Sequence, residues 1–459
     1  MGEPEARALR PKHHRRVSPA RAVVLAFVLA IVLGTVLLRL PIAHAPGEAH
    51  GWLTALFTAT SAVCVTGLVV VDTGADWSPF GQAVIALLIK AGGLGILSLG
   101  ALVALATGRR MGFGERQRLQ MQANALSVGG IVRFVRGLLL FTTSAEAVGA
   151  LALWPRLARD DGLWQGAWSA LFHAVSAFNN AGFSLYADSL ERYAADPWVS
   201  GVVMVLFVVG GLGLVVVVDV ALRLGIGANG SPRRRLTLHT RLALLATVVL
   251  MLGGALVVGA LEWRNPATLG ALSPSARPLA ATFQALTPRT AGFNTLDVAE
   301  YRTPTVFVTM GLMLIGGNPG STAGGVKTTT VAVLLLAVLA AARGRPRVTA
   351  FGRTIGTETI TKAAVLGTLA VTAVGLVVTV MVSTESTLAP LAVLFEAVSA
   401  FGTVGLSLGI TSDLSEAGRL ALVVLMFSGR VGLLTVALAL AATERVPAAR
   451  YPIEDVVVG

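Results

Sequence analysis

The stretch Phe57-Thr-Ala-Thr-Ser-Ala-Val-Cys-Val-Thr-Gly67-Leu lies between two long apolar segments, yet it is too short to cross a bilayer and return as two helices. Three later stretches share its pattern: alanine follows phenylalanine by two residues, serine or threonine by four, and glycine comes near the end. They are Phe172-His-Ala-Val-Ser-Ala-Phe-Asn-Asn-Ala-Gly182-Phe, Phe283-Gln-Ala-Leu-Thr-Pro-Arg-Thr-Ala-Gly292-Phe and Phe395-Glu-Ala-Val-Ser-Ala-Phe-Gly-Thr-Val-Gly405-Leu. Their nearly constant interval indicates an internal repeat.

A second motif recurs in the apolar segment after each stretch. Its four copies are Gly92-Gly-Leu-Gly95, Gly210-Gly-Leu-Gly213, Gly316-Gly-Asn-Pro319 and Gly429-Arg-Val-Gly432. Close packing of glycine-rich membrane helices would explain this second motif, but it would not explain the first. Two motifs in the same order, four times, predict a unit of helix, re-entrant loop and helix.

The composition places these units in a membrane. Of 459 residues, 54% are apolar and only 13% are charged, unlike a soluble globular protein. Since about 20 apolar residues span the hydrocarbon layer, we expect eight full spans, the first of them a retained helix and not a cleaved signal. They cover residues 20–40, 80–106, 137–154, 199–222, 242–261, 305–342, 363–382 and 420–442. The single cysteine, Cys64, excludes an internal disulfide and a cysteine-based zinc cluster.

The net charge is +12, and the positions of the positive residues agree with the expected topology. Most of the 36 Lys and Arg residues lie before residue 22, in residues 109–136, 223–241 and 343–362, and in the C-terminal tail. The alternate connections hold nine, Arg289 among them. By the positive-inside rule both termini are cytoplasmic. The basic surplus is thus a topogenic signal, in part available to anionic lipid, and not a nucleic-acid site.

We therefore predict an all-α membrane protein made of four M1-P-M2 repeats (helix, pore loop, helix) in a pseudo-fourfold arrangement around one central pore. Repeat 1 covers residues 1–136 with the basic N-terminus, and repeat 2 covers residues 137–241. Repeat 3 covers residues 242–362, and repeat 4 covers residues 363–459 with the tail.

Irregular backbone at membrane depth is tolerated only where it is buried in protein or lines a water-filled path. Four such loops are best satisfied by meeting around a common axis, where their carbonyls can replace the hydration shell of a cation. Glycine supplies the backbone angles and the close approach that a Cβ would forbid. The sequence thus predicts a cation pore.

The sixth span is nearly twice the length it needs and is interrupted at residues 316–325, a stretch with five glycines and one proline that cannot remain a regular helix. A passive kink is the simpler interpretation, and an intramembrane gate is the functional one. Arg430 falls within the last span, where a charge usually faces a cavity and serves function. Lys327, at the end of the interruption, either joins the gate or extends to the membrane surface.

These residues resemble the transport subunit of the Trk/Ktr/HKT superfamily of potassium transporters over essentially the whole chain. The resemblance rests on Ser61-Ala-Val-Cys-Val-Thr-Gly67-Leu, on Thr287-Pro-Arg-Thr-Ala-Gly292-Phe-Asn-Thr295 and on Gly316-Gly-Asn-Pro-Gly-Ser-Thr-Ala-Gly-Gly-Val-Lys327. Eight spans and a short tail look most like the Ktr branch. The resemblance implies potassium uptake across a bacterial plasma membrane and no enzymatic activity.

In that family, glycine in all four loops goes with K+ preference, whereas serine in the first loop goes with Na+ permeability in some plant members. The resemblance thus implies a K+ filter, with Na+ coupling or simple electrodiffusion both open and a Na+-permeable transporter as the alternative. The filter would hold K+ as the only metal, with fewer strong sites than a tetrameric channel. Its carbonyls would come from Val65, Thr66, Gly67, Asn180, Ala181, Gly182, Thr290, Ala291, Gly292, Thr403, Val404 and Gly405.

The resemblance also implies a gate below the filter, a homodimer, and a cytosolic ring of RCK-type (KtrA-like) subunits on the basic cytoplasmic loops. Nucleotides would act only through that ring, and no covalent cofactor is implied. The implied gate comprises Gly316, Gly317, Asn318, Pro319, Gly320, Ser321, Thr322, Ala323, Gly324, Gly325, Lys327 and Arg430.

The sequence allows more than one role for several polar residues. Lys90 either faces the pore and lowers conductance or pairs elsewhere, and Asp72 either attracts cations at the outer mouth or caps a helix. The residues that follow the four phenylalanines (Thr58, His173, Gln284 and Glu396) are expected to support the pore helices. A membrane enzyme using His173, Glu146, Glu396 and Cys64 is the alternative from another class, but their spacing matches no metal site or triad. A carrier with inverted repeats is disfavoured because all four units share one orientation.

Overall fold

The computed structural model describes residues 19–95, 128–225 and 235–440. The basic N-terminus predicted up to Arg21 therefore lies mostly outside the described residues. The same holds for most of residues 109–136, for residues 226–234 of the third basic segment, and for the tail.

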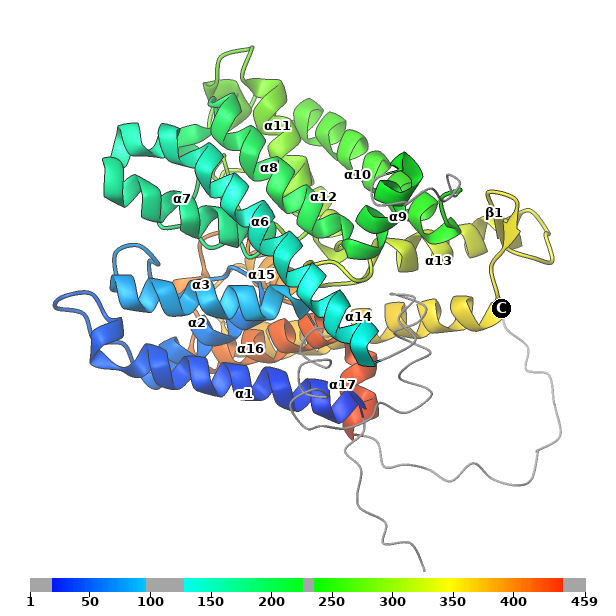
Figure 1. Ribbon diagram of the computed structural model, residues 1–459, viewed down its shortest axis with the longest axis horizontal. Helices are drawn as coiled ribbons and strands as arrows, with labels where there is room; N and C mark the ends of the chain where they lie inside the picture. Colours follow the sequence, from blue (N-terminus) through cyan, green and yellow to red (C-terminus); the bar gives the residue numbers. More distant parts are fainter. Residues whose placement is uncertain (1–18, 96–127, 226–234, 441–459) are drawn as a thin grey trace, which may run out of the picture.

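The first helix of each unit is long, and Figure 1 shows these helices running along the length of the molecule. They are α1 (Pro19–Arg39), α6 (Val128–Asp161), α10 (Leu238–Glu262) and α14 (Thr357–Thr384). Each contains a stretch long and apolar enough to cross a membrane. Large side chains such as Leu29, Leu256 and Val371 are exposed on them, as expected of helices whose surroundings are lipid tails.

A shorter helix precedes each re-entrant loop: α2 (Trp52–Cys64), α7 (Leu163–Phe178), α11 (Arg277–Leu286) and α15 (Pro390–Gly402). The phenylalanine of the repeated motif is at most 1% exposed in all four. Each packs against the first helix of its own unit: α2 on α1, α7 on α6, α11 on α10 and α15 on α14.

A third helix returns in each unit: α3 (Pro79–Gly93), α8 (Pro197–Leu212), α12 (Thr303–Leu314) and α16 (Glu416–Val431). Three of them begin at a side chain that accepts hydrogen bonds from the first turn, namely Ser78, Asp196 and Ser415. Proline at the first position of α3 and α8 strengthens the same start signal.

The returning helices do not continue straight, and this corrects the sequence-based expectation for residues 199–222 and 420–442. Helix α8 turns by 97° into α9 (Leu214–Leu224), and α16 turns by 94° into α17 (Leu433–Leu440). The turning points are Gly213 and Gly432, the fourth residues of the glycine motif, with φ of 82° and 88°. Helix α12 gives way to an irregular loop before α13 (Thr328–Ala342), as predicted, and α3 ends near the last described residue of its segment.

The four units close into a ring. The returning helix of each unit packs against the short helix of the next: α3 on α7, α8 on α11, α12 on α15, and α16 on α2. A Cβ at Gly92, Gly210 or Gly429 would lie 1.9 Å from a carbonyl oxygen at the end of its own unit's short helix. The first glycine of the second motif thus serves close packing. The fold is the pseudo-fourfold M1-P-M2 arrangement that the repeats predict.

The remaining elements are small. The structure has four 3-10 helices among the described residues: η1 (Pro41–Ala43), η2 (Glu191–Tyr193), η3 (Leu269–Ala271) and η4 (Thr411–Asp413). Strands β1 (Thr349–Ala350) and β2 (Arg353–Thr354) form an antiparallel hairpin between α13 and α14, at the right-hand end of Figure 1.

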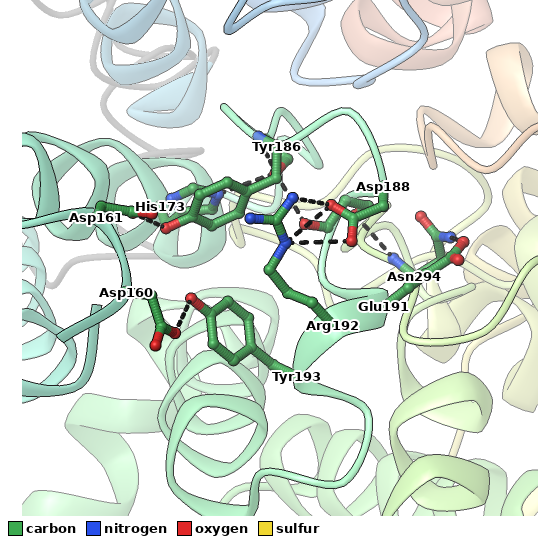
Figure 2. Close-up of polar contacts among 11 residues, drawn as sticks. Asp160, Asp161, His173, Tyr186, Asp188, Glu191, Arg192, Tyr193 and Asn294 are labelled. Atoms are coloured by element: carbon green, nitrogen blue, oxygen red, sulfur yellow. Dashed lines mark hydrogen bonds and ion pairs between the residues drawn. The ribbon is translucent and has the colours of Figure 1, made fainter. Parts of the chain in front are cut away.

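A polar cluster ties the connecting segment of the second unit to the third (Figure 2). The Arg192 guanidinium donates to Asp188 at 2.7 Å and lies 4.4 Å from the centre of the Tyr186 ring. The Asn294 amide donates to Glu191 at 2.7 Å across the boundary between the two units. These contacts hold the chain in place directly after the second re-entrant loop.

Glu191 carries an unfavourable charge within this cluster. Burial is the main cause that raises the pKa of its carboxyl above the ordinary value of 4.5, and nearby Asp297 and Asp188 add to it. The hydrogen bond from Asn294 offsets part of this effect. Because its pKa is higher in the folded state, Glu191 binds protons more readily there, and the fold gains stability as pH falls from above that raised pKa toward 4.5.

Replacement of Gly432 by alanine should destabilise the protein by about 1–3 kcal/mol, because an L residue is strained at this backbone conformation. Thermal unfolding in detergent would measure the change. The matched control is Gly375→Ala within α14, where a Cβ meets nothing within 4 Å and should add up to about 1 kcal/mol of stability. Equal unfolding temperatures for the two variants would contradict this account of the bend.

Glu191→Gln should raise the melting temperature at neutral pH, because the amide oxygen can still accept from Asn294 while the repulsion from Asp188 and Asp297 disappears. The advantage over wild type should shrink as pH falls toward 4.5, the ordinary pKa of the carboxyl. Melting curves between these pH values test this. Glu48→Gln, an exposed glutamate in another connecting segment, controls for the loss of one carboxylate. A constant difference across the pH range would count against the assignment.

Candidate functional site

The four re-entrant loops share one backbone conformation. The residues Val65, Asn180, Thr290 and Thr403 all have φ between 52° and 75°. The glycine two positions later in each loop has φ between 71° and 94°, whereas the residue between them has negative φ. A left-handed valine or threonine costs of order 1–3 kcal/mol and persists where the surrounding fold imposes it. All twelve residues that the sequence nominates as a filter lie in these loops.

The loops meet one another in cyclic order. A Cβ at Gly67 would lie 2.4 Å from the Ala181 carbonyl oxygen, and one at Gly405 would lie 2.2 Å from that of Thr66. Across the other two boundaries, a Cβ at Gly292 would lie 2.3 Å from the Val404 oxygen, and one at Gly182 would lie 2.8 Å from the Gly292 Cα. Any side chain at these four positions would collide with the neighbouring loop. The ring is therefore built from backbone.

The serine or threonine of the repeated motif anchors each loop to its short helix. The Ser61 carbonyl accepts from the Thr66 N–H at 2.8 Å, and the Ser61 hydroxyl accepts from the Gly67 N–H at 3.1 Å. Ser399 makes the same pair of contacts in the fourth loop. In the shorter third loop, the Thr287 carbonyl accepts from the Ala291 N–H at 2.9 Å, and its hydroxyl donates to the Phe293 carbonyl at 2.5 Å.

The polar residue after each motif phenylalanine has a supporting position, as expected, in three of the four units. The His173 Nε2 lies 3.0 Å from the Ser184 hydroxyl, and the Glu396 carboxylate accepts from Thr411 at 3.1 Å. Gln284 lies against Thr295 in the corresponding place. Because each contacts the segment after its own loop, the structure does not bring His173 and Glu396 together as a catalytic set.

The intramembrane loop, residues 316–325, lies against this ring. The Thr322 hydroxyl donates to the Asn180 side-chain oxygen at 2.7 Å, and the Asn318 N–H donates to the Gly211 carbonyl at 3.1 Å. A Cβ at Gly324 would lie 2.1 Å from the Thr403 hydroxyl. The loop therefore contacts the second and the fourth re-entrant loops at once, which a passive kink between helices would not require.

Two cations, the buried Arg430 and the partly buried Lys327, hold the intramembrane loop. Arg430, which is 6% exposed, donates to the Thr322 carbonyl and to the Gly92 carbonyl of the first unit. The Lys327 ammonium donates to the carbonyls of Ala323 and Gly324 at 2.5 and 3.2 Å. Lys327 thus folds back onto the loop it follows and does not extend to the membrane surface.

Lys90 of the first unit and Glu146 of the second unit are in contact. The Lys90 ammonium forms an ion pair with the Glu146 carboxylate and donates to the Thr143 hydroxyl at 3.0 Å. A lone charge at the centre of a membrane helix costs about 3 kcal/mol or more, and pairing relieves that cost. The sequence left both partners unassigned, because nothing local links residues in different repeats.

The structure corrects the position that the sequence predicts for Arg289, which is among the charges of an outer connection. It lies at the base of the third re-entrant loop, 8% exposed, with one guanidinium nitrogen 3.5 Å from the Thr247 hydroxyl. Within the part of the chain that the structure describes, no carboxylate pairs with it. Its place in the repeated motif, three residues before the loop glycine, was the signal that could have located it.

Asp72 has a local role. Its carboxylate accepts from the N–H groups of Gly74 and Ala75, each at 2.7 Å. This is the capping geometry of a turn, which favours the structural alternative over attraction of cations at the outer mouth.

Comparison with known proteins agrees with this architecture. The family model for TrkH, described as a cation transport protein, matches residues 11–447. The chain is 42% identical to the Ktr system potassium uptake protein B of Bacillus subtilis over 97% of both chains. It is 36% identical to the potassium/sodium uptake protein NtpJ of Enterococcus hirae, over 98% of this chain and 99% of that one.

A solved structure shows the same fold. The potassium transporter TrkH from Vibrio parahaemolyticus superposes with a TM-score of 0.73 at 20% identity, covering 95% of this chain and 87% of the other. With the four units, the bent returning helices and the ring of loops described above, the chain belongs to the TrkH family of cation transport proteins, multi-pass membrane proteins that are transporters and not enzymes.

Proposed function

We propose that this chain takes up K+ across the plasma membrane through the ring of four re-entrant loops. The observation that carries the proposal is the ring itself, in which the carbonyls of Thr66, Ala181 and Val404 each lie against the glycine of a neighbouring loop. The names of the Bacillus subtilis and Vibrio alginolyticus relatives, both potassium uptake proteins, support the choice of ion.

The chemistry of the filter follows from its backbone. Carbonyl oxygens replace water around the ion, so K+ enters where the number and spacing of oxygens suit its dehydration. The three residues that would contribute carbonyls differ between loops: Val-Thr-Gly, Asn-Ala-Gly, Thr-Ala-Gly and Thr-Val-Gly. Such a filter offers fewer equivalent sites than four identical loops, which suits transport with a modest number of bound ions.

The intramembrane loop would act as the gate. Residues 316–325 contact two of the four filter loops, and Arg430 and Lys327 bind carbonyls of this gate. Two positive charges beside the path also disfavour cation occupancy while the gate is closed. Opening requires that the contact between Arg430 and the Thr322 carbonyl break, so the guanidinium is the latch.

The assembly would follow the Ktr pattern. Relatives named as components of a Ktr system support a further component, and we propose a cytosolic nucleotide-binding RCK-type ring that binds the basic loops of a homodimer, with both chain termini cytoplasmic. The division into units at residues 136, 241 and 362 belongs to the same proposal. A Na+-permeable transporter is the second candidate, and the potassium/sodium name of the Enterococcus hirae relative is the observation in its favour.

Uptake of Rb+ into liposomes, with Na+ as competitor, tests the filter. Wild type should prefer Rb+ and K+ over Na+, whereas Gly67→Ser should admit Na+, because its side chain would displace the Ala181 carbonyl only 2.4 Å away. Gly47→Ser is the matched control, since Gly47 also has positive φ but a Cβ there meets nothing within 4 Å. If wild type passes neither ion even with the regulatory ring supplied, the proposal fails. Equal permeation of Na+ and K+ by wild type would favour the second candidate.

Arg430→Ala should raise Rb+ flux about fivefold or more, because the gate loses the hydrogen bond that the Arg430 guanidinium donates to the Thr322 carbonyl. Tracer uptake at equal protein abundance measures the change. Arg419→Ala is the control: Arg419 lies eleven residues earlier in the same helix, about 16 Å along its axis, and binds the carbonyls of Leu414 and Ser412. Unchanged flux in Arg430→Ala would refute the latch.

A further inference from the structure

A chain of buried contacts runs from the first unit to the second filter loop. Lys90 of α3 pairs with Glu146 of α6, and the other Glu146 carboxylate oxygen accepts from the Asn179 amide at 2.8 Å. Glu146 is 4% exposed and Asn179 is fully buried. The carboxylate therefore has a distinct partner on each of its two oxygens, one a cation and one an amide.

Asn179 lies at the junction between helix α7 and the second filter loop. Its backbone N–H donates to the Val175 carbonyl at 3.2 Å, which continues the helical hydrogen bonding, and the next residue, Asn180, has the left-handed conformation with φ of 58°. The Asn180 side chain accepts from Thr322 of the gate at 2.7 Å. The second filter loop is thus held on one side by Glu146 and on the other by the gate.

The other three loops have no such arrangement. Three residues before the filter glycine they carry Cys64, Arg289 and Gly402 in place of Asn179. Two residues before the second motif they carry Val208, Leu314 and Phe427 in place of Lys90. Helix α3 also packs directly on the same amide, since a Cβ at Gly93 would lie 2.0 Å from the Asn179 side-chain oxygen.

We propose that Glu146 is a positioning residue for ion selectivity, which it exerts by holding Asn179 and with it the backbone of the second filter loop. Lys90 orients the carboxylate, and the carboxylate accepts a hydrogen bond from the Asn179 side-chain amide. The inference rests on the proposed function and deepens it, because it assigns part of the discrimination between K+ and Na+ to side chains that do not touch the ion. A small shift of one loop changes the oxygen cage that the other three share.

Two double variants isolate the hydrogen-bond acceptor. Lys90→Met with Glu146→Gln removes both charges but keeps an oxygen for Asn179, whereas Lys90→Met with Glu146→Met removes the acceptor too. Neither leaves a buried charge without a partner, so the penalty of an orphaned ion does not confound the pair. A single variant, Asn179→Ala, is a second test of the same hydrogen bond, because it removes the amide that donates to Glu146 and keeps the ion pair between Lys90 and Glu146.

The readout is the ratio of Rb+ to Na+ uptake in liposomes, with melting temperature recorded in parallel. We expect the Gln variant to keep the wild-type ratio within about twofold, and the Met variant and Asn179→Ala to lower it about three- to tenfold, as for residues that act on a site through others. The exposed pair Lys362 and Glu358, changed together to Met, is the control and should keep the ratio.

The outcomes distinguish failure of this inference from failure of the proposed function. If wild type is selective and the Met variant and Asn179→Ala both keep its ratio, even with lower melting temperatures or lower total flux, the contacts are structural only and the inference is overturned. If the Gln and Met variants lose selectivity equally, the charge and not the acceptor matters, which also overturns it. If wild type itself shows no K+ uptake, the proposed function fails and takes the inference with it.

Discussion

The contact of four backbone loops at one axis is the constraint on which the rest of the structure depends. A Cβ at any of the four loop glycines would lie within 2.8 Å of a neighbouring loop's backbone. Because no side chain fits there, the loops can be held only from behind, by the short helices and by whatever packs on them. This explains why the returning helix of one unit contacts the short helix of the next, all the way around.

Within the membrane, the support must also supply hydrogen-bond acceptors for the backbone of the loops. Without water, each N–H of an irregular loop needs a protein acceptor, and the motif serine or threonine provides one at a fixed position. Ser61 and Ser399 use the same two bonds, and in the second and third loops the carbonyls of Ser176 and Thr287 also accept from a loop N–H. The left-handed residues Val65 and Thr403 would be strained in isolation, and these anchors help to impose their conformation.

The charged residues around the ring of loops lie where the four repeats differ from one another. The Arg430 guanidinium bridges the gate and the Gly92 carbonyl of the first unit, Lys90 pairs with Glu146 across another boundary, and Arg289 lies buried beneath the third loop. A symmetric pore would have no place for a gate that enters from one unit only. The charged and polar substitutions in the repeats occur where that single loop, or its neighbours, must be held.

The sequence by itself determined the repeat unit, the loop positions and the interruption at residues 316–325, because glycine, proline and apolar length act locally along the chain. Only the tertiary structure decided the partner of Glu146, the burial of Arg289, the inward fold of Lys327 and the bends at Gly213 and Gly432. Lys90 and Glu146 are 56 residues apart, and Arg430 and Gly92 are 338 apart. Which charges meet at such separations depends on how whole helices pack, and the direction of a side chain follows from that packing and not from its neighbours in sequence.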